Sequence, residues 1–396
     1  MGATNIKNTT GTPVTRENFF GRVNEVRDGW TLIEEGKSLK LDAPRRVGKS
    51  SFAYKMIEIA EAQGWKCAFW NVEGCQNEQS LYHRFISVLE KNNQKSATKN
   101  KWDLKKIEVS IQAIAKLGVT VENENNTDAS QGNNIFSNLE RIIDHAKDTL
   151  IVIDEIAVYL NHLEVKGQLS DARQFLHWLS SQRQVPNSRV RWILCSSISI
   201  DTFIDRHEIN KTMKGIENFP IDELKGNEPV LLIEALATSA KLYFSDEAKK
   251  CMLDKLGWHL PYYIQRLFQA VRRLEETDVS VNTVEKAYRN ILDAAGKDDY
   301  FKTIYQDLNN NYKDNKEYAR LLLDTISKSL KGSSVNVLKS LIFDKVDNAE
   351  KAETIFKELL EKLKNDGYIM SDEKGKKYVF RSPLIRDFWY NRFMRK

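Results

Sequence analysis

Cysteine and histidine are scarce in this chain of 396 residues, and neither is arranged for a metal or a disulfide framework. The four cysteines (Cys67, Cys75, Cys195 and Cys251) are scattered and form no C-x-x-C pair. The six histidines show no metal-ligand spacing with them. We therefore expect reduced thiols in a cytoplasmic protein.

The chain also has no long apolar run and no strong charge of one sign. No stretch approaches the roughly 18 apolar residues of a membrane span, and the polar residues 1–15 lack the apolar core of a secretory signal. The formal net charge of +5 permits contact with nucleic acid without arguing for it. At 41% hydrophobic and 29% charged residues, we expect a globular protein of two or three domains with no membrane partner.

Glycine is missing at one informative position. Residues 43–51 read Ala-Pro-Arg-Arg-Val-Gly-Lys-Ser-Ser, which matches G-x-x-x-x-G-K-[ST] except that Ala43 replaces the first glycine. The segment follows a short apolar run, Ser38–Leu41, and precedes an amphipathic helical run, Phe52–Ala62. A strand, a tight loop and a helix in this order cradle a nucleoside triphosphate.

This loop assigns roles to its residues. Backbone N–H groups surround the β-phosphate, Lys49 reaches the β- and γ-phosphate oxygens, and the hydroxyl of Ser50 holds Mg²⁺. The alternative is a surface turn that caps a helix, since a Gly-Lys-Ser/Thr triplet occurs by chance in roughly one chain in five of this length. The nucleotide-binding candidates are Ala43, Pro44, Arg45, Arg46, Val47, Gly48, Lys49, Ser50 and Ser51.

A second motif, Thr-Leu-Ile-Val-Ile-Asp-Glu at residues 149–155, supports the first. The aliphatic run Leu150–Ile153 predicts a strand buried on both faces, as in a parallel sheet. Ligands bind at the carboxyl ends of such strands, where Asp154 would order the Mg²⁺ shell and Glu155 would polarise the attacking water. An acidic turn after a core strand is the alternative, and the upstream loop disfavours it.

The order of the predicted elements indicates an α/β fold followed by helices. Strands alternate with helices in the first half, which is typical of a parallel sheet, and residues 91–134 interrupt them with a possible hairpin, Lys106–Val121, and a polar loop. Helical patterns dominate from about Leu224 onward. The predicted strands are Ser38–Leu41, Lys66–Asn71, Leu150–Asp154, Val190–Cys195 and a short one near Phe219–Ile221.

The C-terminal region suggests a winged helix-turn-helix. An amphipathic helix, Ala349–Lys364, precedes two short strands, Tyr368–Met370 and Tyr378–Phe380, and a final helix that starts at Pro383. Four glutamates and four lysines mix on the first helix, whereas a DNA-facing helix normally has a net basic face. We therefore favour a protein-interaction or autoinhibitory role for this domain and keep contact with DNA as the minority interpretation.

Several motifs, taken in order, resemble the archaeal-type ATPases in the STAND branch of AAA+ proteins. They are the entry motif Phe-Gly-Arg-x-x-Glu at residues 20–25, the phosphate loop, the strand ending Asp-Glu, Trp-Ile-Leu-Cys-Ser-Ser at 192–197, Gly-Trp-His-Leu-Pro-Tyr-Tyr-Ile-Gln at 257–265, and Ser-Pro-Leu-Ile-Arg-Asp-Phe-Trp at 382–389. The resemblance implies a P-loop NTPase (ASCE/AAA-like) parallel sheet flanked by helices, a helical lid and a winged-helix domain. The implied divisions are a flexible segment at 1–18, the ATPase domain at 19–225 with an insertion at 91–134, the lid at 226–300, and the winged helix at 301–396.

The resemblance also implies roles for further residues. Val190–Cys195 would lie between the two motif strands, with Ser196 or Ser197 near the γ-phosphate as a catalytic hydroxyl or, alternatively, as a strand-end cap. Pro261 would pack near the nucleotide, and Arg22 would lie on the adenine side. The arginine-finger candidates are Arg189 and Arg191, with Arg183, Arg45 and Arg46 as further choices.

The implied function is an ATP-binding and ATP-hydrolysing switch that uses Mg²⁺. Its nucleotide state would control domain rearrangement or assembly and the binding of a protein partner or a second copy. The catalytic residues would be Lys49, Glu155 and Ser197, with Ser50 and Asp154 on the metal. Two alternatives are a non-hydrolysing nucleotide-bound scaffold and an ATPase that acts on DNA.

Overall fold

The computed structural model describes residues 6–95, 101–103, 105–107, 135–197, 199–294, 304, 306, 308–309, 312, 315–372 and 374–395. The chain divides into two compact units. The sheet unit comprises Val23–Ala43 and Lys49–Ile221, and the helical unit comprises Met1–Arg22, Pro44–Gly48 and Asp222–Lys396. The predicted hairpin and loop between residues 106 and 134 lie outside the described residues from residue 108 onward.

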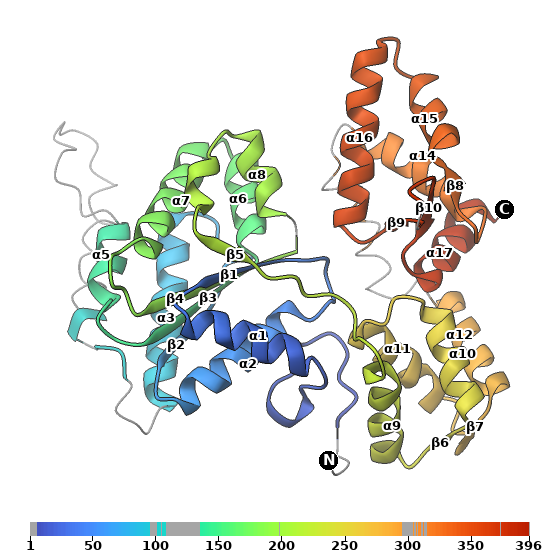
Figure 1. Cartoon of the computed structure of the whole chain (residues 1–396), viewed down its shortest axis with the longest axis horizontal. Helices are drawn as coiled ribbons and strands as arrows, with labels where there is room; N and C mark the ends of the chain where they lie inside the picture. The colour runs from blue at the N-terminus through green and yellow to red at the C-terminus, as the bar shows by residue number, and fades with distance from the viewer. Residues whose placement is uncertain are drawn as a thin grey trace. The chain divides into compact units, whose positions relative to one another are not determined.

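The sheet unit is built on five parallel strands in the order β2-β3-β4-β1-β5 (Figure 1). This sheet confirms the P-loop NTPase fold expected from the sequence. The strand β4 pairs with β1 on one side and with β3 on the other, so it lies between the two motif strands as predicted. The strands are β1 (Ser38–Asp42), β2 (Lys66–Asn71), β3 (Thr149–Asp154), β4 (Val190–Ser196) and β5 (Ile216–Asn218).

The last strand lies earlier in the chain than the sequence predicted. Its residues are Ile216–Asn218, whereas the apolar pattern suggested Phe219–Ile221. Phe219 instead follows the strand and stacks on Phe52 of α2 (Lys49–Ala62), with 5.3 Å between the ring centroids. The apolar residues therefore mark the packing of the segment after the strand rather than the strand itself.

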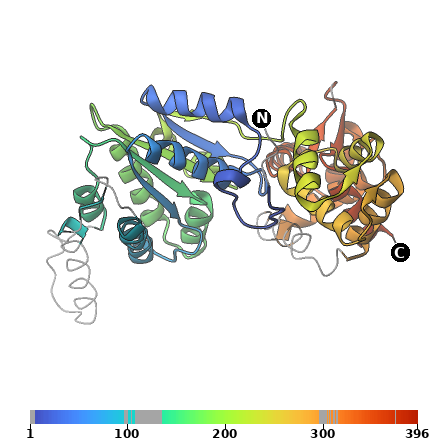
Figure 2. The same ribbon diagram turned by 90° about the horizontal axis from the view of Figure 1, so that it is seen from below.

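Helices cover both faces of this sheet (Figures 1 and 2). One face packs against α1 (Val23–Glu34) and α2. The other packs against α3 (Glu78–Lys95), α5 (Ile135–Ile142), α6 (Ile156–Val165), α7 (Leu169–Arg183) and α8 (Ile200–Arg206). All six residues of β3 are buried, which is why this strand reads as one uninterrupted aliphatic run.

The helical unit contains two groups of elements. The first comprises α9 (Glu228–Ala240), β6 (Tyr243–Phe244), α10 (Asp246–Leu256), α11 (Pro261–Arg272), β7 (Asp278–Val279) and α12 (Val281–Ala294). The second comprises α14 (Lys316–Ser327), β8 (Ser333–Ser334), α15 (Val335–Phe343), α16 (Ala349–Asn365), β9 (Ile369–Ser371), β10 (Lys377–Phe380) and α17 (Pro383–Trp389). In this second group, an antiparallel sheet of order β8-β10-β9 follows the predicted helix-then-two-strands pattern.

The N-terminal segment makes specific contacts within the helical unit. The sequence suggested a flexible segment over residues 1–18. In the described part of it, Ile6 is 2% exposed, and the side-chain amide of Asn8 donates a hydrogen bond to the carbonyl of Gln265 in α11. At Asn8 the segment is thus bonded to α11, whereas most of residues 11–18 are exposed.

Candidate nucleotide site

The phosphate loop connects β1 to α2 through two residues with positive φ. Arg46 has φ +71° and Gly48 has φ +107°, and α2 begins immediately afterwards at Lys49. A residue with a Cβ is strained at the φ of Gly48, so the backbone conformation explains why the Gly-Lys-Ser triplet begins with glycine. Ala43 is not among the described residues with positive φ, so alanine fits the first position of the loop without backbone strain.

Lys49 is buried at the start of α2. It is 5% exposed, and its Nζ donates a hydrogen bond of 2.6 Å to the carbonyl of Ala43. Taking an ammonium group out of water is costly unless acceptors or negative charges face it. The position suits a lysine that exchanges a backbone carbonyl for phosphate oxygens.

Ser50 and Asp154 are joined although they are 104 residues apart in sequence. The hydroxyl of Ser50 donates a hydrogen bond of 2.8 Å to Oδ2 of Asp154, while Oδ1 of Asp154 is buried without a hydrogen-bond partner. Burial, and then the charge of Glu155, raises the pKa of Asp154 to about 6. A buried carboxylate with a spare oxygen beside a serine hydroxyl is the donor set of a magnesium site that takes its other ligands from water and phosphate.

Glu155 follows β3 in a left-handed backbone conformation, with φ 62° and ψ 37°. Such a conformation is strained for a residue with a side chain and is often found at functional sites. Oε2 of Glu155 accepts hydrogen bonds from the hydroxyl of Ser197 (2.6 Å) and from its backbone N–H (3.2 Å). Ser197 therefore holds the candidate catalytic carboxylate.

The neighbouring Ser196 has a different environment. It is fully buried, and its hydroxyl accepts a hydrogen bond of 3.3 Å from the backbone N–H of Ala157 at the start of α6. This contact matches the strand-end cap that the sequence left open for either serine. Of the two hydroxyls, the one bonded to Glu155 belongs to Ser197.

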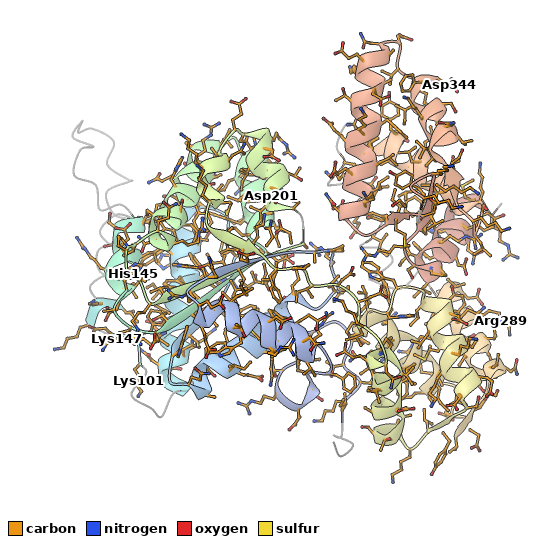
Figure 3. All side chains as sticks on the ribbon, in the orientation of Figure 1. Lys101, His145, Lys147, Asp201, Arg289 and Asp344 are labelled. Atoms are coloured by element: carbon orange, nitrogen blue, oxygen red, sulfur yellow. The ribbon has the colours of Figure 1, made fainter. Side chains whose placement is uncertain are left out.

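A third carboxylate, which was not among the candidates predicted from the sequence, lies at this edge of the sheet. Asp42 is the last residue of β1, and burial, opposed by Lys40 and aided by Asp201, raises its pKa to about 6. Oδ2 of Asp42 accepts a hydrogen bond of 3.2 Å from the N–H of Ile200, and its Oδ1 is buried without a partner. Lys40 pairs with Asp201 of α8, a residue that is labelled in Figure 3. An acidic residue ending the strand just before the loop was the only signal in the sequence.

The remaining loop candidates and the two outlying ones belong to the helical unit. Arg22 is 2% exposed, and its Nη2 donates hydrogen bonds to the carbonyls of Val47 (2.7 Å) and Asp222 (2.5 Å). The guanidinium of Arg46 lies 4.8 Å from the ring centre of Tyr262. Pro261 occupies the first turn of α11, where its missing N–H costs no hydrogen bond.

The arginine-finger candidates lie at the amino-terminal ends of the strands and are bonded within the sheet unit. Nε of Arg189 donates 2.7 Å to Oδ1 of Asp148, and Nη2 also pairs with that carboxylate. Nη1 of Arg191 donates to the carbonyls of Ser188 and Val190, while Arg183 donates to those of Thr212 and Lys214. Whether any of them reaches a second subunit stays a prediction.

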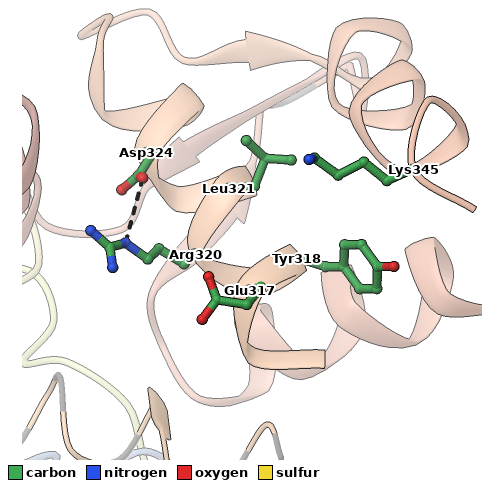
Figure 4. A pocket seen from close by; sticks show the side chains of 6 residues that line it. All are labelled: Glu317, Tyr318, Arg320, Leu321, Asp324 and Lys345. Atoms are coloured by element: carbon green, nitrogen blue, oxygen red, sulfur yellow. Dashed lines mark ion pairs between the residues drawn. The ribbon is translucent and has the colours of Figure 1, made fainter. Parts of the chain in front are cut away.

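A separate cavity of about 670 Å³ lies in the second group of the helical unit, on α14 (Figure 4). Its lining contains no residue selected from the sequence. Asp324 in this cavity pairs with Arg320 (3.7 Å) and accepts a hydrogen bond of 2.7 Å from Nε1 of Trp389, so its carboxylate is already engaged. The lining residues are Glu317, Tyr318, Arg320, Leu321, Asp324 and Lys345.

The described residues contain neither a helix that could span a membrane nor a ready-made metal-ligand cluster. Within them, no helix is both long and apolar enough to cross a membrane. In the same part of the chain, no three or more His, Cys, Asp or Glu side chains are arranged to hold a metal ion by themselves. Any magnesium at Ser50 and Asp154 would thus depend on nucleotide and water for most of its ligands.

Comparison with known proteins places the fold. No protein-family model matches the chain, and no curated protein matches it by sequence. A Walker-type ATPase of Pyrococcus abyssi superposes with a TM-score of 0.65 over 96% of this chain and 99% of its own, at 14% identity. The ORC2 protein of Aeropyrum pernix gives a TM-score of 0.48 at 12% identity, covering 94% of this chain and 95% of its own. At 14% identity, the likeness to the Pyrococcus abyssi protein shows the fold alone, which is that of a P-loop NTPase.

Proposed function

We propose that this protein binds ATP with Mg²⁺ and hydrolyses it, and that it works as a nucleotide-dependent switch of the STAND/AAA type. The observation that carries the proposal is the hydrogen bond from Ser50 to Asp154, with the second oxygen of Asp154 buried and unpartnered. Two motifs 104 residues apart meet there beside a buried lysine. A surface turn that merely caps a helix does not require this meeting.

Each residue contributes a distinct step. Lys49 and the N-terminus of α2 stabilise the charge that develops on the transferred phosphoryl group. Ser50 and Asp154 would hold Mg²⁺, which when bound neutralises phosphate charge and orients the oxygens. Glu155 would position the attacking water, and Ser197 sets the orientation of that carboxylate.

One observation favours a second candidate, a nucleotide-bound scaffold that does not hydrolyse. Both hydrogen bonds from Ser197 go to Oε2 of Glu155, so one oxygen of the candidate base is engaged. Water activation then depends on the other oxygen or on release of Ser197. Hydrolysis remains the favoured function because Glu155 is kept at the strand end by a strained backbone.

For the C-terminal group of elements we propose a winged-helix domain that contacts a protein partner or a second copy. On α16, Glu353 pairs with both Lys339 (2.6 Å) and Lys357 (3.2 Å). Because these lysines are used within the domain, fewer charges remain for DNA phosphates. A DNA-acting ATPase is therefore the minority proposal, and it is abandoned if DNA at low salt neither shifts in a gel nor stimulates turnover.

Steady-state phosphate release decides between hydrolysis and scaffold. We expect the wild type to release phosphate only with Mg²⁺, and Glu155→Gln to bind ATP but to lose about 100-fold in turnover. Glu90→Gln, the same charge change at an exposed position of α3, is the control and should match the wild type. Bound ATP without release in the wild type would support the scaffold, and no ATP binding would remove both proposals.

A further inference from the structure

The phosphate loop is joined by side chains to the C-terminal end of the chain. Residues Pro44–Gly48 belong to the helical unit, although the strand before them and the helix after them belong to the sheet unit. Two sets of contacts connect the loop to the rest of the helical unit, and they begin at Val47 and at Pro44. They end at Arg381 and Gly367, more than 300 residues later.

The first link is Arg22. Its Nη2 donates to the carbonyl of Val47 and to the carbonyl of Asp222, and its own backbone N–H donates to Oε1 of Glu228 at 2.6 Å. Since the peptide unit is planar and trans, holding the Val47 carbonyl also sets the direction of the Gly48 N–H. That N–H is one of the backbone donors that a phosphate loop offers to its ligand.

The second link is Asp222, which receives Arg22 on its carbonyl and three groups on its carboxylate. One of these is local, since the N–H of Glu223 donates 2.9 Å to Oδ1. Oδ1 accepts a hydrogen bond of 3.0 Å from Nε1 of Trp258, and Oδ2 forms an ion pair with Arg381. The guanidinium of Arg381 also lies 4.3 Å from the ring centre of Trp258. The carboxylate of Asp222 is thus bonded both by Trp258, from the first group of the helical unit (α9 to α12), and by Arg381, from the second, C-terminal group (α14 to α17).

The C-terminal group is held in this position by further contacts within the helical unit. The hydroxyl of Ser382 donates 2.8 Å to the carbonyl of Leu256, and the hydroxyl of Tyr288 donates 2.8 Å to Oδ2 of Asp387. Gly257 packs so closely on Pro383 that an added Cβ would lie 2.4 Å from the proline Cδ. These contacts place Arg381 by tertiary packing rather than by its charge alone.

A direct contact reaches the loop as well. Gly367, with φ +78°, packs so that an added Cβ would lie 2.7 Å from the ring of Trp258 and 2.9 Å from Cγ of Pro44. The C-terminal group therefore touches one end of the loop at Pro44 and acts on the other end, at Val47, through Asp222 and Arg22.

We propose that Arg381 is a positioning residue for the phosphate loop. Through Asp222 and Arg22 it holds the Val47–Gly48 peptide in the orientation that receives phosphate, so docking of the C-terminal group sets nucleotide affinity. This inference rests on the proposed function, because the affinity in question is that for ATP. It goes beyond that function by naming the residue that links the C-terminal domain to the site.

The first test measures ATP affinity and turnover in variants of Arg381. We expect Arg381→Ala to weaken ATP binding about three- to tenfold, because the Val47–Gly48 peptide of the variant is no longer held in one orientation before ATP binds. Turnover at saturating ATP should stay within about twofold of the wild type, because the catalytic groups are unchanged. Arg381→Lys keeps the ion pair and should recover most of the affinity. Arg392→Ala removes the same charge from an exposed position in the same group and should leave affinity unchanged.

The second test needs no nucleotide. Arg45 is exposed and Arg46 half-buried, so trypsin cleavage after these residues reports how firmly the loop is held. We expect faster cleavage in Arg381→Ala and in Asp222→Asn, and no further increase in the double variant, because residues of one network are not additive. Thermal unfolding of each variant identifies any that fails to fold, and Arg381→Lys then carries the comparison.

The outcomes separate the two proposals. Faster loop cleavage in a protein that binds no ATP would keep the positioning role and remove the proposed function. Wild-type cleavage and affinity in Arg381→Ala would overturn the positioning role while ATP binding stands. Equal losses in Arg381→Ala and Arg392→Ala would also overturn it, since the effect would then be one of net charge.

Discussion

Charged groups differ in their hydrogen-bond partners between the carboxyl ends and the amino ends of the strands in the central sheet. At the carboxyl ends, Asp42 and Asp154 each bury an oxygen without a partner, and both pKa values are raised to about 6. At the amino ends, Asp148 is paired with Arg189, and both ring nitrogens of His145 are hydrogen-bonded. Figure 3 labels His145 and Asp201 at these two ends.

This difference has a physical origin in the chain path. At the carboxyl ends, the chain turns from β1 and β3 into helices through residues with positive φ, namely Arg46, Gly48 and Glu155. The helix N-termini that follow carry partial positive charge and free N–H groups, which favour anions. At the amino ends, both terminal nitrogens of Arg183 and Nη1 of Arg191 donate to backbone carbonyls, although the Nε of each arginine is buried without a partner. The buried, unpartnered carboxylate oxygens of Asp42 and Asp154 thus mark the end at which we expect a ligand.

The largest effect on ATP affinity should come from removing Lys49 at the carboxyl ends of the strands. Lys49→Ala removes a charge-assisted contact to phosphate, and we expect roughly 100-fold weaker ATP binding by titration calorimetry. Lys55→Ala, on the same helix but paired with Glu58 and half-buried, is the control and should bind as the wild type does. Equal losses in both variants would contradict a specific role for Lys49.

The next prediction concerns the folding stability that is lost because the carboxylate of Asp154 is buried. The pKa of Asp154 in the folded protein is about 6, above the usual value of an unfolded aspartate, so folding loses stability as pH rises from about 4 to 6. Asparagine cannot ionise and still accepts a hydrogen bond from Ser50. Asp154→Asn should therefore raise the free energy of unfolding by about 1–3 kcal/mol at pH 7.5 and by much less at pH 4.5, measured in urea.

Asp148, at the amino ends of the strands, offers a matched control for Asp154→Asn. Asp148→Asn removes a paired, partly exposed carboxylate, and we expect no gain in stability at either pH. If Asp148→Asn gains as much unfolding free energy as Asp154→Asn, the cost of burying a charged carboxylate is not specific to the carboxyl ends of the strands.

A smaller effect should follow from loosening Glu155. Ser197→Ala removes the 2.6 Å hydrogen bond to that carboxylate, and we expect about a fivefold change in turnover with ATP affinity nearly unchanged. Ser196→Ala is the paired control, since its hydroxyl accepts from Ala157 and should affect stability rather than turnover. Unchanged turnover in Ser197→Ala would return its hydroxyl to the role of a strand-end cap.

The smallest effect is expected for Arg189→Ala at the amino ends. The guanidinium is bonded to Asp148, so ATP affinity should change less than about twofold. Phosphate release measured across a range of protein concentrations tests its other predicted role. A loss of turnover that grows with concentration would identify Arg189 as an arginine that acts on a neighbouring subunit.

Much of the site could be predicted because its parts are local in sequence. The Gly-Lys-Ser triplet, the aliphatic strand ending Asp-Glu and the strand ending Ser-Ser are short segments whose period and end residues are visible directly. The parallel arrangement then brings their carboxyl ends together, as the contact of Ser50 with Asp154 confirms. Phe219 is an exception, because an apolar residue there suggested a strand, whereas it lies after β5 and packs on Phe52.

The sequence patterns predicted the fold class and proposed Lys49, Ser50, Asp154 and Glu155 as the candidate site, and the family resemblance added the position of β4 between the motif strands. Only the tertiary structure decided that Asp42 is a buried acid, that Ser197 rather than Ser196 bonds Glu155, and that Val47 is tied through Arg22 and Asp222 to Arg381. The reason is range. Periodicity and turn chemistry act over a few residues, whereas burial and pairing depend on groups that the fold brings together from positions up to several hundred residues apart.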